Sequence, residues 1–247
     1  MAHDGTSKLH CDMAYRLLIF DADVTLYDYN RAEHYALSSA FSDLQLPFDA
    51  DRTIPIYRRI NGAIWRAFEN GEISQSDISP RRFSEFLPEL AIVADVGLLS
   101  AAYLEHLAEA DFLIPGAEAI IEELVSRYSM AIVTNGLSRV QRGRFGRSSI
   151  ANHFHPIVIS DEVGVQKPDP RIFERVFENY PHISRHEALM IGDSLTSDIA
   201  GGVAAGIDTC WYRPEEQSSR GKTPGSRTFL PDPTYEIAHL DDLRRLL

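Results

Sequence analysis

Residues 15–25 read YRLLIFDADVT, an apolar run that ends in a pair of carboxylates. A continuous apolar run of this length is typical of a strand buried on both faces, as in a parallel sheet covered by helices. Four further runs of the same kind occur along the chain, at residues 130–133, 156–159, 188–191 and 209–212. Stretches with helical spacing of apolar residues separate these runs, and the alternation predicts an α/β fold with a doubly wound parallel sheet.

One long interval breaks this alternation. About 85 residues, from 27 to 111, separate the first strand from the next strand–helix unit. A plain loop of that size is improbable because connections usually span ~4–6 residues. Apolar residues recur at helical spacing inside the interval, as in residues 57–68. We therefore expect a helical domain of residues 28–112, inserted into an α/β core domain of residues 1–27 and 113–247.

Short polar segments stand at or shortly after the ends of four predicted strands. Ligands of open α/β sheets bind beyond the carboxyl ends of the strands, where the strand order reverses. We therefore expect the side chains of these segments to share one pocket. The segments are DADVT at residues 21–25, TNG at 134–136, KP at 167–168 and GDSLTSD at 192–198.

The first segment carries Asp21 and Asp23, two carboxylates that can divide two tasks between them. One can stay ionised as a nucleophile while the other serves as general acid and base. A carboxylate that attacks a phosphate dianion meets charge repulsion, so this chemistry needs a divalent cation. The structural alternative is a strand that simply ends in acidic turn residues.

The other segments supply groups that could bind a phosphate and a cation. Thr134 and Asn135 suit phosphate oxygens near a helix N-terminus, although a helix cap has the same pattern. Lys167 offers a compact positive charge to the phosphate, although most lysines are solvated surface residues. Asp193 would project toward a hard cation, which prefers carboxylate oxygen. Asp198 could support that cation through a water molecule.

In this order, with an insertion after the first, the four segments resemble motifs I to IV of the haloacid dehalogenase superfamily. The resemblance covers nearly the whole chain and includes a helical cap of the C1 type between motifs I and II. It implies a Rossmann-like core and an Mg²⁺-dependent phosphatase that works through an aspartyl-phosphate intermediate.

The resemblance also implies a role for each matching residue. Asp21 would be the nucleophile, and Asp23 would protonate the leaving group and then activate water. Thr134 and Lys167 would hold the phosphoryl group. The implied Mg²⁺ ligands are Asp21, the backbone carbonyl of Asp23, Asp193 and, through water, Asp198.

Two positions of the first motif refine this interpretation. Val24 stands where many members of the superfamily carry glycine. Because a β-branched residue disfavours positive φ, we expect this turn to use an ordinary backbone conformation. Asp23 is an acid, whereas the dehalogenating members lack an acid at that position. Cleavage of a carbon–halogen bond is therefore disfavoured.

Residues of the predicted cap indicate the class of substrate. Residues 61–74 resemble the cap of bacterial pyrimidine 5′-nucleotidases that clear non-standard nucleotides. Trp65 could stack on a base, Asn61 could bind its hydrogen-bonding edge, and Arg66 could contact an anionic group. The alternative is that Trp65 and Phe68 only hold the cap helices together.

The leading hypothesis is thus a phosphomonoesterase for nucleoside monophosphates, most of all pyrimidine ones. A phosphatase for another small phosphate, such as phosphoglycolate or a sugar phosphate, would use the same core, and so would a phosphomutase. A non-catalytic binding module is expected to have lost a core carboxylate, whereas Asp21, Asp23 and Asp193 are all present.

Composition limits the partners and the compartment. With 24 basic and 36 acidic residues the net charge is −12, which argues against a nucleic-acid polymer or an anionic membrane as the main partner. Residues 1–13 lack the apolar core of a secretory signal, and Cys11 and Cys210 form no disulfide framework. We expect a cytoplasmic enzyme that acts on a small phosphorylated metabolite and is a monomer or a homodimer.

Overall fold

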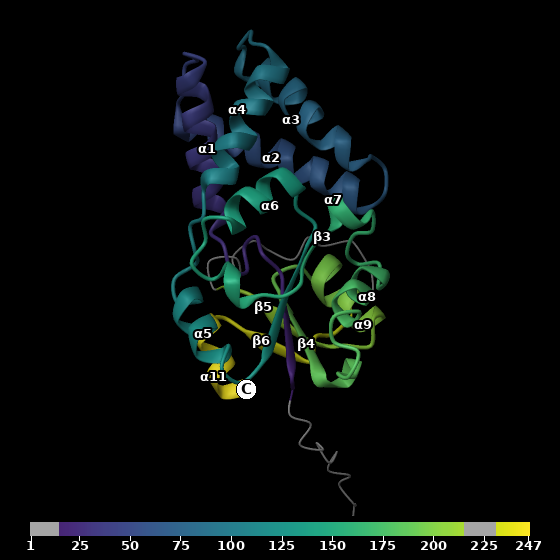
Figure 1. Ribbon diagram of the computed structural model, residues 1–247. Coiled ribbons are helices and arrows are strands. Elements are labelled where there is room, and N and C mark those ends of the chain that lie inside the picture. The colour runs from purple at the N-terminus through teal and green to yellow at the C-terminus, as the bar shows by residue number, and fades with distance from the viewer. Residues whose placement is uncertain (1–14, 215–230) are drawn as a thin grey trace, which may run out of the picture.

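Six parallel strands form one sheet in the order β3-β2-β1-β4-β5-β6 (Figure 1). The computed structural model describes residues 15–214 and 231–247. The strands are β1 (Leu17–Phe20), β2 (Ser129–Thr134), β3 (Ile157–Ile159), β4 (Ala188–Gly192), β5 (Asp208–Tyr212) and β6 (Tyr235–Ile237). The predicted doubly wound parallel sheet is confirmed, and its order reverses between β1 and β4, at the centre of the sheet.

The sheet is buried on both faces, which explains the unbroken apolar runs. Leu18 and Phe20 of β1 pack on one face against α5 (Ala117–Leu124) and α11 (Leu243–Leu246). Leu17 and Ile19 point to the other face, where α8 (Arg171–Phe177) covers the sheet. Side chains of a strand alternate between faces, so a strand covered on both sides must be apolar at every position.

The interval after β1 contains four helices, which lie above the sheet in Figure 1. They are α1 (Tyr29–Asp43), α2 (Ala50–Glu69), α3 (Gln75–Leu90) and α4 (Val96–Glu109). Their apolar faces form a hydrophobic cluster separate from the two clusters that flank the sheet. The chain therefore has a helical insertion with a core of its own.

Shorter elements complete the described chain. They are α6 (Ser138–Phe145), α7 (Ser160–Val163), α9 (Ala200–Ala204), the 3₁₀ turns at Ala151–His153, Arg185–Glu187 and Leu240–Asp242, and a π-helical turn at Leu195–Ile199. The π-helical turn occupies the region of GDSLTSD, directly after β4, and such turns are frequent at functional sites.

The two chain segments that join the helices to the sheet lie side by side. Tyr27 and Leu113 form an antiparallel bridge. The amide of Asp28 donates to the carbonyl of Phe112 at 2.8 Å, and the amide of Ile114 donates to Leu26 at 2.9 Å. The insertion thus leaves and re-enters the α/β layer through two adjacent segments, residues 26–28 and 110–114, which we call the paired crossing.

Other sequence-based expectations can be placed on this structure. None of the helices within residues 15–214 and 231–247 has the length and apolar character that a membrane span requires. Cys210 is a free, buried thiol. Cys11 and the polar segment of residues 1–13 lie outside the described residues.

Candidate functional site

A pocket of about 300 Å³ lies between the carboxyl edge of the sheet and the helical insertion. All four polar segments contribute to its wall, together with residues of α1 and α2. Of the residues predicted for the site, all but Arg66 line it: Asp21, Asp23, Asn61, Trp65, Thr134, Asn135, Lys167, Asp193 and Asp198. Arg66 is exposed on α2, outside this pocket.

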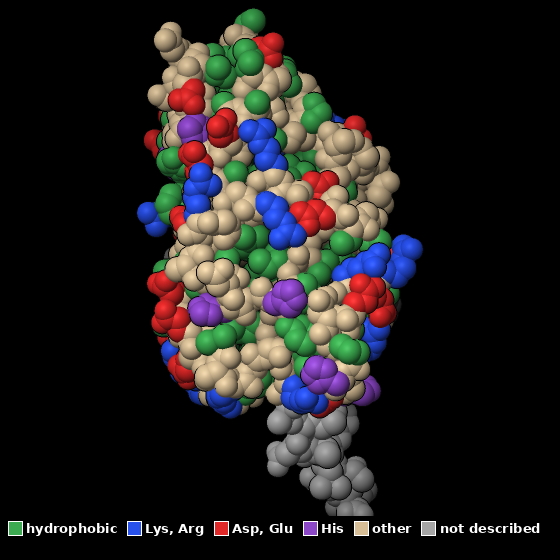
Figure 2. Space-filling view, in the orientation of Figure 1, with side chains coloured by type: hydrophobic (Ala, Val, Ile, Leu, Met, Phe, Trp, Pro, Cys, Tyr) green, Lys and Arg blue, Asp and Glu red, His purple; other side chains and the backbone are tan. Residues whose placement is uncertain are grey.

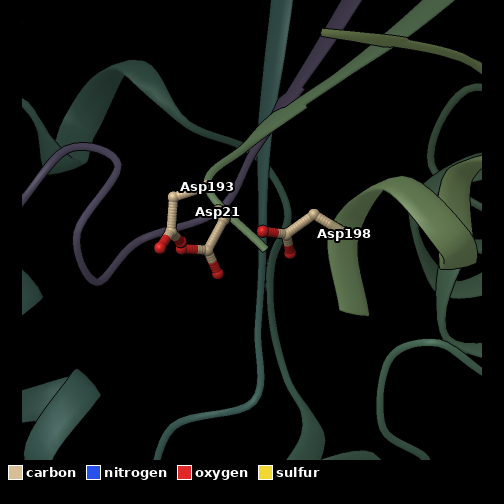
Figure 3. Close-up of side chains that lie close together, drawn as sticks. All are labelled: Asp21, Asp193 and Asp198. Carbon is tan, nitrogen blue, oxygen red and sulfur yellow. The ribbon is translucent and has the colours of Figure 1, made fainter. Parts of the chain in front are cut away.

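Three of these carboxylates converge beyond the ends of β1 and β4. Asp21, Asp193 and Asp198 each offer an oxygen, and these oxygens all lie within 4.8 Å of one another (Figure 3). Asp21 and Asp198 are buried, and Asp193 is half-buried. An oxygen-only donor set of this kind suits a hard divalent cation such as Mg²⁺.

The cluster concentrates negative charge away from water. Burial raises the pKa of Asp21 to about 7, with repulsion from Asp198 and Asp23 adding to the effect and the charge of Lys167 opposing it. Burial also raises the pKa of Asp193 well above its ordinary value, and the charges of Asp198 and Asp21 raise it further. A bound cation would favour the ionised forms of these groups, so the donor set fits a divalent cation both in chemistry and in charge.

Lys167 is the positive charge of the site. Its side chain is 1% exposed, and its Nζ donates to Asp21 at 2.6 Å, to Asp198 at 2.7 Å and to the carbonyl of Val133 at 2.6 Å. Burial lowers the pKa of Lys167, but the two carboxylates raise it more, so the net shift is upward. The ammonium group therefore stays charged at neutral pH.

Gly192 makes the approach of Asp198 possible. A Cβ at this position would lie 2.3 Å from Oδ2 of Asp198, so no other residue fits without a shift of that carboxylate. The backbone amide of Ser194 donates to the same Oδ2 at 2.9 Å, while Oδ1 accepts from Lys167. The glycine of the GDSLTSD segment is thus explained by packing at the site.

Thr134 and Asn135 extend the site from the end of β2. Thr134 is buried, and its Oγ1 accepts a hydrogen bond from the amide of Gly136 at 3.2 Å. The side chain of Asn135 bonds to the backbone of Lys167 at both ends, through Nδ2 at 3.0 Å and Oδ1 at 2.8 Å. Asn135 thereby fixes the loop that carries Lys167, besides lining the pocket.

The expectation of an ordinary backbone at Val24 is wrong. Val24 has a φ of 68°, in the left-handed region. Its amide donates to the carbonyl of Tyr27 at 2.9 Å, and the amides of Leu26 and Tyr27 both bond to the carbonyl of Ala22. This tight loop imposes a conformation that costs a β-branched residue about 1–2 kcal/mol. The loop geometry overrides the preference of the side chain.

Side chains of the helical insertion close the pocket from the other side. Asn61, Trp65 and Glu69 recur every four residues on α2 and therefore share one face of that helix. Asn61 is 5% exposed, and its Nδ2 donates to the hydroxyl of Tyr29 at 3.2 Å. Its Oδ1 has no hydrogen-bond partner among the described residues. An acceptor is thus left at the pocket wall.

Four residues at or behind this wall were not predicted from the sequence. Tyr29 and Glu69 line the pocket, and burial raises the pKa of Glu69, with the charge of Asp198 adding to it. Gln141 and Arg144 lie behind the wall on α6 and hold Asp23. In the sequence α6 reads as a polar helix, for which a solvent-exposed face is the ordinary expectation.

Known proteins resemble this chain over most of its length. A family model described as "Haloacid dehalogenase-like hydrolase" matches residues 18–212. The HAD-hydrolase YfnB of Bacillus subtilis is 40% identical over 94% of this chain and 95% of its own. A crystal structure of YfnB, described as bound to magnesium and revealing interdomain movement, superposes with a TM-score of 0.83 at 39% identity, covering 95% of this chain and 99% of that one.

Two further relatives carry functional names. The pyrimidine 5′-nucleotidase PynA of Streptococcus pneumoniae is 33% identical over 94% of each chain. The pyrimidine 5′-nucleotidase YjjG of Escherichia coli is 31% identical over 95% of this chain and 99% of its own.

Proposed function

The chain belongs to the haloacid dehalogenase-like hydrolase family, and on that premise we propose that it hydrolyses pyrimidine nucleoside 5′-monophosphates with the help of Mg²⁺. The observation that carries the proposal is the meeting, in one pocket, of the carboxylate cluster and Lys167 with Asn61 and Trp65 of α2. Two relatives named as pyrimidine 5′-nucleotidases support the same substrate class.

In this proposal the cation binds at the carboxylate cluster. Asp21, Asp193 and the backbone carbonyl of Asp23 would hold it, with Asp198 assisting through water. When bound, the cation supplies positive charge that lets an anionic side chain approach an anionic phosphate.

Asp21 is the proposed nucleophile. One of its oxygens forms a bond to phosphorus while the bond from phosphorus to the 5′-oxygen of the nucleoside breaks. Lys167 bonds to Oδ1 of Asp21 at 2.6 Å and thereby orients the carboxylate. The product of this step is an aspartyl phosphate together with the free nucleoside.

Asp23 is the proposed acid and base. It gives a proton to the departing 5′-oxygen and then takes one from the water that attacks phosphorus, which releases inorganic phosphate and restores Asp21. Its side chain is 27% exposed and lines the pocket, so it can face both the leaving oxygen and the incoming water.

The phosphoryl oxygens are proposed to lie against Thr134 and Lys167. Both side chains are buried at the pocket wall, where water competes little for their hydrogen bonds. Asn135 helps by fixing the backbone of Lys167. This set would hold the phosphate through both steps.

The base is proposed to lie against α2. Trp65 offers a ring for stacking, and the buried, unpaired Oδ1 of Asn61 would accept from a donor on the base edge once the side chain turns toward it. Arg66, expected from the sequence to contact an anionic group, lies outside the pocket, and we assign it no contact with substrate.

We further propose that residues 28–112 act as a cap over a core of residues 1–27 and 113–247. Closure about the paired crossing at Tyr27 and Leu113 would bring α2 onto the bound nucleotide. The description of the YfnB structure, which refers to interdomain movement, supports such a motion. Because the proposed substrate is a small intracellular metabolite, we expect the enzyme to act in the cytoplasm.

A substrate panel tests the proposal. Hydrolysis of pyrimidine and purine nucleoside 5′-monophosphates, sugar phosphates and phosphoglycolate would be compared by kcat/KM in the presence of Mg²⁺. Pyrimidine nucleotides should be preferred, and chelation of the cation should stop turnover of every substrate. A chain that handles phosphoglycolate or a sugar phosphate as well as nucleotides would retain the phosphatase assignment and lose the nucleotidase one. Isomerisation of a sugar phosphate without release of inorganic phosphate would indicate a phosphomutase instead.

A further inference from the structure

Asp23 is held from behind by two buried side chains of α6. Gln141 Nε2 donates to Oδ2 of Asp23 at 2.6 Å, and Arg144 Nη1 donates to Oδ1 at 2.5 Å. Gln141 is 1% exposed and Arg144 is 0% exposed. Each carboxylate oxygen therefore has a fixed donor on the side away from the pocket, and its remaining lone pairs can still accept from the pocket side.

Arg144 also contacts both segments of the paired crossing. Its Nε donates to the carbonyl of Ala110, directly after α4, at 3.1 Å. Its guanidinium carbon lies 5.1 Å from the ring centroid of Tyr27, in the segment that leaves the sheet. One side chain thus joins Asp23 to the chain on its way out of the α/β layer and on its way back.

Two glycines make room for this arrangement. A Cβ at Gly136 would lie 2.2 Å from Nε2 of Gln141, the atom that bonds to Asp23. A Cβ at Gly143 would lie 2.8 Å from the Cβ of Ala108, near the end of α4. Helix α6 therefore packs closely against the site through Gln141 and against α4 through Gly143.

The pairing also accounts for the burial of a charged side chain. A guanidinium removed from water is costly unless it is paired and hydrogen-bonded. In Arg144 the pairing partner is Asp23 itself, bonded through Nη1, and the carbonyl of Ala110 accepts from Nε. The ring of Tyr27 lies beside the guanidinium, whose Nη2 has no partner among the described residues. A residue that served only to fill this space could be apolar.

We propose that Gln141 and Arg144 are positioning residues that hold the Asp23 carboxylate in the direction required for proton transfer and tie that direction to the paired crossing. The inference rests on the proposed function, because it takes Asp23 as the acid and base. A carboxylate bonded through both oxygens cannot rotate freely about its side-chain torsions, so its remaining lone pairs keep facing the pocket. Movement of the crossing would move Arg144 and, with it, Asp23.

Paired aryl phosphates can test this role. Phenyl phosphate needs a proton on its poor leaving group, whereas 4-nitrophenyl phosphate, of nearly the same shape, does not. The ratio of the two kcat/KM values covers only the steps up to release of the first product, so it reports on proton donation. In Gln141→Met and in Arg144→Lys, kcat/KM for phenyl phosphate should fall about tenfold more than for 4-nitrophenyl phosphate, a part of the ~10²–10⁴-fold contribution typical of a general acid.

A matched control comes from the same helix. Arg142 is exposed and pairs with Glu162, so Arg142→Gln should leave the ratio unchanged. Equal loss on both aryl phosphates in Gln141→Met, or no loss on either, would overturn the inference. Gln141→Met keeps the length of the side chain and removes its amide, of which only Nε2 bonds to a described residue while Oε1 has no partner, so the test stands even if Arg144→Lys does not fold.

Asp23→Asn distinguishes a failure of the acid–base role of Asp23 from a failure of the positioning role of Gln141 and Arg144. If this variant shows the selective loss on phenyl phosphate and the α6 variants do not, Asp23 is the acid and the positioning inference alone fails. If Asp23→Asn shows no selective loss, the acid–base role in the proposed function fails, and the inference fails with it.

Discussion

At the scale of single residues, the site gathers more negative charge than a buried pocket holds at low cost. Three carboxylates with oxygens within 4.8 Å of one another face the one ammonium group of Lys167. Burial raises the pKa values of Asp21 and Asp193, and repulsion from the neighbouring carboxylates adds to both shifts. This imbalance of charge makes the pocket a good binding site for a divalent cation.

The imbalance predicts how stability depends on pH and on Mg²⁺. The pKa of Asp21 is about 7 in the folded chain against an ordinary 3.8, so the folded state retains a proton that the unfolded chain releases. The contribution of Asp21 to the free energy of unfolding is therefore fully present below about pH 4 and is lost as the pH rises through about 7. Mg²⁺ binds the ionised carboxylates and should therefore raise Tm more at about pH 8 than at about pH 5. At roughly a hundredfold excess over Kd, the rise at the higher pH should be about 5 °C or more.

Calorimetry with and without Mg²⁺ at the two pH values would make this measurement. Asp193→Asn serves as the control, because the loss of one proposed ligand should shrink the response to the cation. A Tm that does not respond to Mg²⁺ at either pH would contradict the assignment of the cluster as a cation site.

Val24 supports a second prediction at this scale. Its φ of 68° is unfavourable for any residue with a Cβ and neutral for glycine. Val24→Gly should therefore be more stable than Val24→Ala by about 1 kcal/mol, because both lose the valine methyl groups and only glycine is free of the strain. Urea unfolding of the two variants would measure the difference. If the alanine variant proved the more stable, the left-handed turn at this position would be wrong.

The residues of the site differ in how far the sequence predicts them. Asp21 and Asp193 could be found because each directly follows a buried strand in a recognisable segment. Arg144 could not, because a polar helix is the ordinary pattern of a solvated surface and only the tertiary structure buries this one. The backbone conformation of Val24 could not be predicted either, because the hydrogen bonds of its loop outweigh the intrinsic preference of valine.

At the scale of elements, helix α2 presents one face to the pocket. The four-residue spacing of Asn61, Trp65 and Glu69 aligns them along the helix, while Arg66 falls on another side. The sequence suggested Asn61 and Trp65, but it could not orient α2 relative to the sheet. That orientation depends on packing among the four helices, which is why Arg66 was placed in the site and Glu69 was missed.

Trp65→Ala tests the role of this face. Loss of stacking, worth about 1–3 kcal/mol per base, should lower kcat/KM for pyrimidine nucleoside monophosphates roughly tenfold to a hundredfold. Ribose 5-phosphate, which carries no base, should be nearly unaffected in a parallel assay. Trp65 also packs edge-to-face on Phe68, with ring centroids 5.7 Å apart. An equal loss on both substrates together with a lower Tm would assign Trp65 to packing alone.

At the scale of the whole molecule, the topology of the sheet places the site. The order reverses between β1 and β4, and Asp21 and Asp193 follow these two neighbouring strands. The apolar runs predicted such a sheet because full burial leaves no polar position in a strand. The number and packing of the inserted helices could not be predicted in the same way. Each amphipathic helix shows the same apolar spacing whichever helix it packs against, so the pattern does not identify its neighbours.

The charge of the molecule is consistent with a small substrate. The net charge is −12, and the face seen in Figure 2 mixes basic and acidic side chains without one broad basic patch. A polymer of phosphates would meet no extended attraction on such a face. A single phosphate needs only the local charge of Lys167 and of the bound cation.

The central claim is that Asp21 takes the phosphoryl group, and the direct test is to trap it there. The enzyme would be quenched with acid during turnover of phenyl phosphate with Mg²⁺, digested, and analysed by mass spectrometry. We expect one phosphoryl group on Asp21, its absence in Asp21→Asn, and a loss of kcat in that variant of about a thousandfold or more with the fold intact. A phosphoryl group on another residue, or turnover that survives in Asp21→Asn, would contradict the account.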